Sequence, residues 1–130
     1  MSTINAGQSL QRFTQDKWYA YSGVVQGDAT LPATITLIDI PNTGLNNAFI
    51  KITASYGFTN QLGVNDTLGI EIKIDGITVF KSQGNDYRPT VSRTPVELFV
   101  PKQSRLEVIS LNTSNNNTQD RACTVLGWYV

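Results

Sequence analysis

Apolar residues follow a two-residue period over most of the chain from Trp18 onward. The segment 48–56, AFIKITASY, sets Ile50, Ile52 and Ala54 on one phase and mainly polar residues on the other. This period places the two sets on opposite faces of a β-strand, and clusters of Gly, Pro, Asn, Asp and Ser separate the apolar segments. We predict eight strands, at residues 18–25, 33–40, 48–56, 70–74, 77–80, 96–100, 105–111 and 122–130.

The clearest local signal is IEIKIDGITVF, residues 70–80. Asp75-Gly76 favours a type I′ turn, which needs positive φ at both central positions, and this turn would set Ile72 opposite Val79. Within 105–111 the apolar phase slips after Val108, which indicates a β-bulge. The predicted core face of the hairpin holds Ile70, Ile72, Ile74, Ile77 and Val79, and the outward face holds Glu71, Lys73, Thr78 and Phe80.

Eight strands without a helical period favour two packed sheets, because an open sheet would leave its edges exposed. The predicted fold is an all-β, eight-stranded antiparallel β-sandwich of the jelly-roll type. At 130 residues the chain fits one domain, over 17–130. Residues 1–16 are polar with few apolar positions, and we expect an extended N-terminal arm there, although a short helix from Ser9 to Lys17 is an alternative.

Composition narrows the possible functions. Ten basic and ten acidic residues balance, so no net field would attract nucleic acid. No apolar segment is long enough to span a membrane, and the polar start lacks the apolar core of a signal peptide, so we expect a soluble protein made in the cytoplasm. Histidine is absent, which removes imidazole-dependent nucleophiles and the usual zinc sites. The single cysteine, Cys123, excludes an internal disulfide and is expected in the core.

Candidate catalytic groups are few. The glutamates Glu71, Glu97 and Glu107 each alternate with apolar neighbours on a predicted strand, so we interpret them as solvent-facing positions. Among the aspartates, Asp28, Asp66, Asp75, Asp86 and Asp120 lie in turn sequences. Calcium remains an alternative in the segments GVNDT, 63–67, and GNDY, 84–87, although no EF-hand series is present. We therefore expect no enzyme activity, no catalytic residue, no cofactor and no metal.

Candidate interface residues lie in the arm and loops. Leu10 and Phe13 are apolar residues on an arm that cannot bury them alone, so we expect them to dock on the domain or on a neighbouring copy. Tyr87 and Arg88 are loop residues of types that are enriched at binding hot spots. The adjacent aromatic pairs Trp18-Tyr19 and Trp128-Tyr129 must each send one ring to either face of a strand, so that one ring is core and the other is surface or interface.

Taken together, the polar arm, the compact β domain with Asn- and Thr-rich loops, the absence of histidine and the final aromatic strand VLGWYV resemble the small jelly-roll decoration, or cement, proteins of tailed-phage capsids. The resemblance covers the whole chain but concerns architecture and composition. It implies a protein on the capsid surface of a virion, made in the host cytoplasm. It also implies a trimer that binds the major capsid protein between capsomers and stabilises the shell, with the loops 57–67, 82–95 and 112–121 as contact surfaces.

The main alternative is a carbohydrate-binding β-sandwich module, free or part of a phage tail or fibre. Such a module would use exposed aromatic rings and loop amides to hold sugar. A roughly coplanar pair of exposed rings would favour carbohydrate, and a flat self-complementary surface would favour the capsid role. An enzyme is the third hypothesis and would need two carboxylates converging in a pocket.

Overall fold

The computed structural model describes residues 10–13, 17–23, 25–27, 34–58, 68–84, 90–92, 95–111 and 119–130. Every regular element in these ranges is a β-strand, and none is a helix long and apolar enough to cross a membrane. The strands are β1 (Leu10–Phe13), β2 (Lys17–Tyr21), β3 (Val25–Gly27), β4 (Thr34–Ile40), β5 (Ala48–Phe58), β6 (Leu68–Ile74), β7 (Ile77–Gly84), β8 (Thr90–Ser92), β9 (Val96–Val100), β10 (Leu106–Leu111) and β11 (Gln119–Tyr129).

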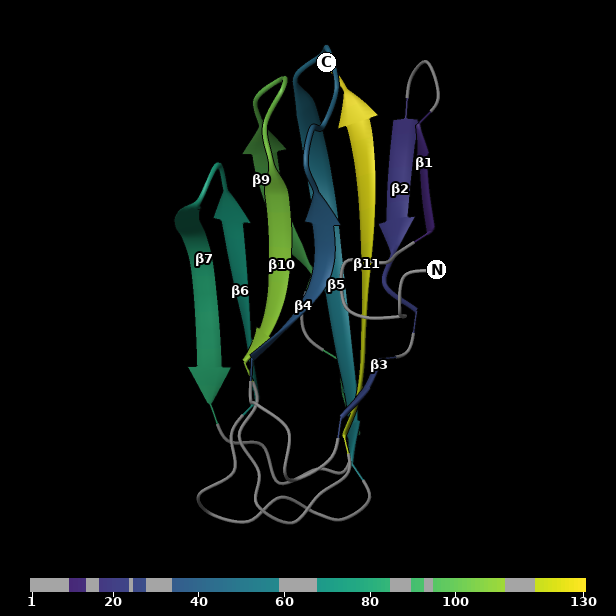
Figure 1. Ribbon diagram of the computed structural model, residues 1–130, viewed down its shortest axis with the longest axis vertical. Coiled ribbons are helices and arrows are strands. Elements are labelled where there is room, and N and C mark those ends of the chain that lie inside the picture. Colours follow the sequence, from purple (N-terminus) through teal and green to yellow (C-terminus); the bar gives the residue numbers. More distant parts are fainter. Residues whose placement is uncertain are drawn as a thin grey trace.

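The strands form two antiparallel sheets that pack face to face (Figure 1). One sheet contains the order β2-β11-β5 with β9 on the far side of β5, and the other has the order β4-β10-β6-β7. Successive long strands mostly alternate between the sheets, so each sheet joins segments that are distant in the sequence. This arrangement is a jelly roll, which confirms the predicted fold class.

Each of the eight predicted segments contains a strand, and the structure adds three short ones. The predicted segment 18–25 divides into β2 and the start of β3, and β8 lies in a segment expected to be a loop. The additional strand β1 pairs with β2, with Leu10 opposite Tyr21 and Phe13 opposite Trp18. The alternative of a helix from Ser9 to Lys17 is therefore wrong where the chain is described. The other residues of the predicted arm, 1–9 and 14–16, lie outside the described residues.

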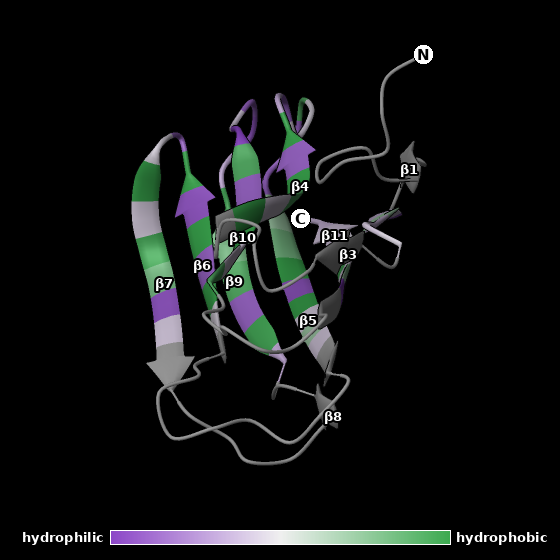
Figure 2. Cartoon of the chain, turned by 60° about the horizontal axis from the view of Figure 1, so that its bottom comes forward, coloured by the Kyte–Doolittle hydropathy of each residue, from purple (hydrophilic) through white to green (hydrophobic). Residues whose placement is uncertain are grey.

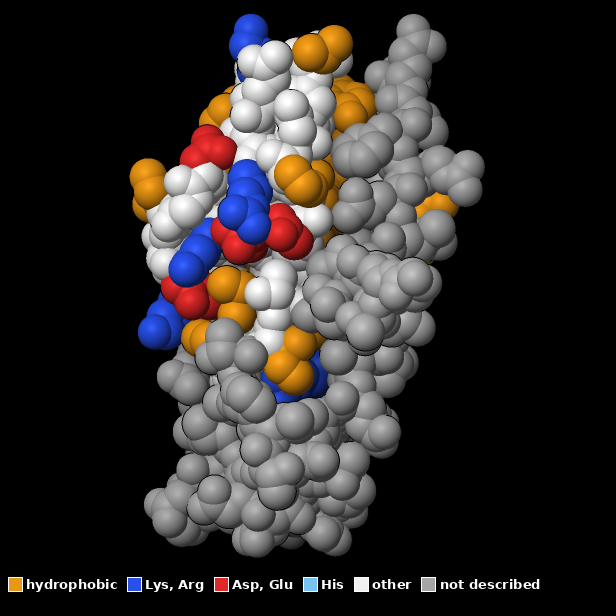
Figure 3. Space-filling model, in the orientation of Figure 1, with side chains coloured by type: hydrophobic (Ala, Val, Ile, Leu, Met, Phe, Trp, Pro, Cys, Tyr) orange, Lys and Arg blue, Asp and Glu red, His pale blue; other side chains and the backbone are white. Residues whose placement is uncertain are grey.

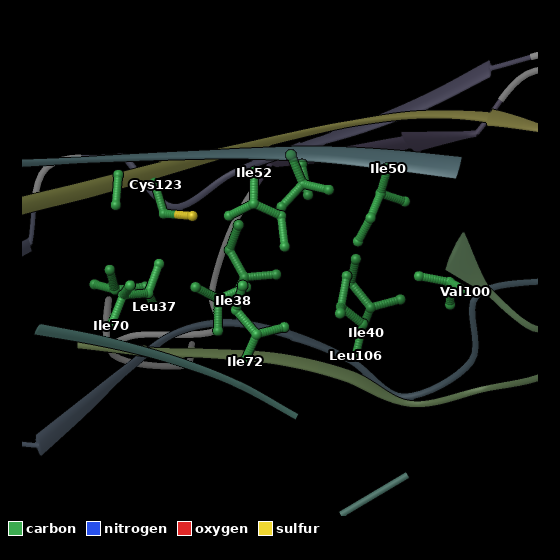
Figure 4. Close-up of a cluster of buried hydrophobic side chains, with 14 of the residues drawn as sticks. Leu37, Ile38, Ile40, Ile50, Ile52, Ile70, Ile72, Val100, Leu106 and Cys123 are labelled. Carbon is green, nitrogen blue, oxygen red and sulfur yellow. The ribbon is translucent and has the colours of Figure 1, made fainter. Parts of the chain in front are cut away.

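The core lies between the sheets and consists mainly of aliphatic side chains (Figure 4). The two-residue alternation that predicted the strands is visible as alternating hydrophilic and hydrophobic bands along β5, β6 and β10 (Figure 2). Removing these side chains from water is the main stabilising contribution to such a fold. The buried cluster comprises Trp18, Ala20, Leu37, Ile38, Ile40, Ala48, Ile50, Ile52, Ala54, Ile70, Ile72, Val100, Leu106, Val108, Cys123 and Val125.

The Asp75-Gly76 hairpin forms as predicted, because both turn residues have positive φ, 52° and 80°. One detail of its register was wrong. A bulge between Ile72 and Lys73 sets Ile72 opposite Phe80 and leaves Val79 without a partner across the ladder. As a result Phe80 packs against the core and Val79 is exposed. Ile77 keeps its predicted partner Ile74 but is 68% exposed beside the turn, so its predicted place on the core face was also wrong.

The predicted bulge in β10 is confirmed by a register shift between Val108 and Ile109 in the pairing with β4. The shift explains why the burial pattern of β10 leaves the strict alternation. Val108, Ile109 and Ser110 are all buried, although Ile109 lies outside the main core cluster.

Candidate interaction surface

The outer side of the sheet β2-β11-β5-β9 carries aromatic side chains in register. Trp128 lies opposite Lys17 on one side and Phe49 on the other, and Phe49 lies opposite Phe99. Residues directly opposite one another in an antiparallel pair project to the same face. These side chains therefore form a row across four strands. Two further rows lie beside it, each two residues farther along the strands.

We call this surface the ring face. Its second row runs from Tyr19 through Leu126 and Lys51 to Glu97, and its third row holds Tyr21, Thr124 and Thr53. The members are Lys17, Tyr19, Tyr21, Phe49, Lys51, Thr53, Glu97, Phe99, Thr124, Leu126 and Trp128.

The rings of this face are substantially exposed. Phe49 is 54% exposed, Phe99 47% and Trp128 42%. The rings of Phe49 and Phe99 contact each other edge to face, with centroids 5.5 Å apart and planes at 71°. An isolated exposed apolar side chain is ordinary on a protein surface, but a contiguous row of rings across three strands is typical of a surface that binds another molecule.

The alternation within the strands explains how the rings reach this side. Trp18 is buried while its neighbour Tyr19 is half-buried on the ring face, and Trp128 is exposed while Tyr129 packs against the core. The expectation that each aromatic pair divides between the core and the surface is confirmed. Burial raises the pKa of the Tyr129 hydroxyl.

Hydrogen bonds between two loops fix the end of the sandwich beside the ring face. The Thr43 N–H donates to the Ser104 carbonyl at 2.8 Å, and the Ser104 N–H donates to Thr43 Oγ1 at 3.1 Å. The Gln103 N–H donates to the Gly44 carbonyl at 2.7 Å. Gly44 has a φ of 105°, which the absence of a side chain permits. These bonds hold Leu45, which is 78% exposed, on an anchored loop.

The outer side of the other sheet has a different character. Arg105 donates two hydrogen bonds to Asp39, from Nε at 3.0 Å and from Nη2 at 2.8 Å, and its Nη2 lies 3.6 Å from Glu107. The hydrogen bond to Asp39, followed by the charges of Asp39 and Glu107, raises the pKa of Arg105. Basic and acidic side chains alternate over this face in the space-filling view (Figure 3). Charged residues are depleted at the cores of protein interfaces, so this face suits protein contact less well than exposed rings do.

The glutamates behave as strand residues on the surface. Glu97 is exposed, Glu107 lies beside Arg105, and Glu71 accepts a hydrogen bond from the Thr78 hydroxyl at 2.5 Å. Among the described residues, no group of three His, Cys, Asp or Glu side chains is arranged to hold a metal ion. Both candidate calcium segments lie outside those residues, except for Gly84.

Cys123 lies in the core, as expected. Its side chain is 1% exposed, and burial raises the pKa of the thiol to about 12. A thiol that stays protonated is a poor nucleophile, so the structure places no reactive thiolate at this position.

The residues selected from the sequence do not come together in one described site. Leu10 and Phe13 lie on β1, at the edge of the sheet beside β2. Tyr87 and Arg88 lie outside the described residues, as do most of the three predicted contact loops. Sequence reasoning did not select Phe49 and Phe99. The available signal was their position on the outward phase of two strands, but the pairing of those strands joins residues far apart in the sequence.

Comparison with known proteins supports the fold class. In sequence, the chain matches no protein-family model and no curated protein. In structure, it superposes on a chain of the infectious bursal disease virus Gx strain with a TM-score of 0.56 and 10% identity, over 89% of this chain and 33% of that one. It also superposes on the VP2 subviral particle of infectious bursal disease virus with a TM-score of 0.51 and 11% identity, over 95% of this chain and 38% of that one.

These two comparisons show a shared fold with viral particle proteins. The chain spans only about a third of the length of each viral chain that it matches. A carbohydrate-binding module, CBM36 in complex with calcium and xylotriose, superposes with a TM-score of 0.34 and 14% identity over 97% of this chain and 98% of that one. A superposition this weak does not indicate a shared fold.

Proposed function

We propose that this protein is a non-enzymatic structural protein of a virion, which binds the outer capsid surface between capsomers and stabilises the shell. The ring face carries the proposal, because it is an exposed row of aromatic side chains across one sheet with an anchored loop beside it. The jelly-roll fold shared with viral particle proteins is consistent with this role. The proposed partners are the major capsid protein and further copies of this chain, with the trimer implied by the family resemblance as a prediction.

The energy available from the ring face suits a repeated contact. Aromatic side chains bury roughly 150–250 Å² each, so rings that are about half exposed retain on the order of 100 Å² apiece. Three such rings would contribute roughly 7 kcal/mol of hydrophobic stabilisation on complete burial. Association costs on the order of 4–15 kcal/mol, so a single copy would bind weakly. Many copies on one shell multiply a modest interaction.

Carbohydrate binding is the second candidate, because exposed rings also suit the apolar face of a sugar. The geometry of the rings favours the first candidate. Phe49 and Phe99 meet at 71°, so the pair does not form the coplanar platform on which a sugar ring could lie. An edge-to-face pair instead presents an uneven apolar surface, which suits interdigitation with protein side chains.

The experiment that tests the proposed function measures binding of the purified protein to capsids of its source virus that were assembled without it. We expect binding and an increase in the temperature at which the capsids break open. The variant Trp128→Thr should weaken binding about tenfold or more, because large aromatic residues dominate such interfaces. The matched control is Val79→Thr, on the other sheet, since Val79 and Trp128 are 43% and 42% exposed.

Val79→Thr should bind as the wild type does. Absence of capsid binding, together with binding to a glycan array that Trp128→Thr abolishes, would replace the capsid role with carbohydrate recognition. Equal loss of capsid binding in both variants would show that the ring face is not the binding surface.

A further inference from the structure

The two edges of the ring face carry opposite charges. Lys17 lies on β2 at one edge, and Glu97 lies on β9 at the other, and both side chains are exposed. Two strands, β11 and β5, separate them. Three inter-strand spacings amount to about 14 Å, so the two charges interact little within one chain. Lys51 lies directly opposite Glu97 in the neighbouring strand and is exposed only in part.

We propose that a second copy of this chain covers the ring face, related to the first by a two-fold axis that runs parallel to the strands between β11 and β5. A two-fold interface must be self-complementary. If one residue contacts a second residue of the partner, the partner's copy of the first residue contacts the second residue of this chain. This axis places β11 over β5 of the second copy and β2 over its β9. The inference rests on the proposed function in one respect, namely that the ring face binds protein. One face cannot hold two partners at once, so this dimer is a form of the free protein that dissociates when the ring face binds a capsid.

The order of residues along the rows is complementary under this rotation. Trp128 lies against the partner's Phe49, so the exposed rings cover each other. Tyr19 lies over the partner's Glu97, where its hydroxyl can donate a hydrogen bond to the carboxylate. Lys17 lies one row from the same carboxylate, within the reach of two long side chains. Each of these contacts occurs twice, so opposite charges meet at both edges of the interface.

The size of the face predicts a weak dimer. Outward positions on four strands in three rows cover on the order of 400 Å² per copy, given the usual spacings within a sheet. A standard stable interface buries about 800 Å² per partner. Two sheets that pack face to face stay roughly 30° from alignment, which still allows the central rows to meet. We therefore expect association that depends on protein concentration.

The test measures self-association by sedimentation over a series of concentrations, with the charge-reversal variants Lys17→Glu and Glu97→Lys. In each variant alone, like charges face each other across the interface, and self-association should weaken about tenfold or more. When the two variants are mixed, the reversed glutamate of one faces the reversed lysine of the other. The mixture should therefore associate with nearly the wild-type affinity. The control Lys81→Glu reverses an exposed charge on the other sheet and should associate as the wild type does.

Three outcomes would overturn the proposed dimer. These are a wild-type protein that stays monomeric at every concentration, single variants that associate as well as the wild type, and a mixture that associates no better than either variant alone. The trimer that the family resemblance implies is the opposing prediction, and a trimer that is insensitive to both reversals would exclude the two-fold arrangement.

Capsid binding measured on the same samples separates the two proposals. Self-association without capsid binding would refute only the proposed function, and capsid binding by a wild-type protein that stays monomeric would refute only the dimer.

Discussion

Substituting Gly127 by alanine tests how closely the core packs around Trp18. Gly127 lies on β11 directly opposite Trp18 on β2. A Cβ atom at Gly127 would lie 2.5 Å from Cε2 and 2.5 Å from Nε1 of the Trp18 ring. Ordinary contacts between such atoms are about 3.5–4.0 Å, so the ring or the strand would have to move by about 1 Å. Trp18 is 1% exposed and belongs to the close-packed core cluster, so the ring can move only by displacing its neighbours.

Two opposing contributions decide the size of the effect. Alanine loses less backbone entropy than glycine on folding, which would stabilise a strand by roughly 0.5–1 kcal/mol. Overpacking a close-packed core costs about 1–3 kcal/mol. We therefore expect Gly127→Ala to lower the free energy of unfolding by about 1–2 kcal/mol. The melting temperature should fall by roughly 4 °C for each kcal/mol lost in a domain of this size.

Urea denaturation followed by tryptophan fluorescence measures this change, and a double-mutant cycle with Trp18→Leu tests its cause. In the Trp18→Leu background the ring is absent, so the additional substitution Gly127→Ala should cost nothing or should stabilise. A Gly127→Ala protein as stable as the wild type would refute the reasoning. The same cost in both backgrounds would show that contact with the ring is not the reason.

Two further predictions concern the hairpin and the thiol. Gly76→Val should destabilise the fold by about 1–2 kcal/mol in thermal denaturation, because Gly76 has a φ of 80°, which a β-branched residue adopts at a cost. An added Cβ would contact no other atom, so the backbone conformation alone accounts for the loss. Unchanged stability would contradict a requirement for positive φ. Cys123 should resist alkylation until the protein unfolds. Because burial raises its pKa from 9.0 to about 12, the unfolded state loses the thiol proton first, and stability should fall as the pH rises through that interval. Cys123→Ala should remove that component, and an identical pH profile would contradict the assignment.

The sequence predicted the fold class because the strand signals are local. Alternation revealed the core face of β5, and Asp75-Gly76 indicated the turn between β6 and β7. The error at Val79 arose because a bulge depends on how the whole hairpin packs, which the turn alone does not determine. The bulge in β10 was found because its apolar residues themselves change phase.

The candidate surface was less accessible from the sequence. Phe49 and Phe99 gain significance only when β5 and β9 pair, which sets their rings 5.5 Å apart. That pairing is a long-range property of the jelly roll, and no local pattern encodes it. Reasoning from residue type instead selected Tyr87 and Arg88, which stay predictions outside the described residues.

The unlike outer faces of the sandwich bear on how far an assembly of this protein can grow. The described residues place exposed rings on one sheet, and they place Arg105 with its acidic partners on the other. Once the rings are covered, a molecule turns its ion-paired side toward the solvent. Within the described residues that side carries ion pairs beside the exposed Ile77 and Val79, and it presents no second row of rings to recruit another molecule. If the ring face binds a surface, this protein would therefore form a single layer there, because the outward side of each molecule differs from the side that binds.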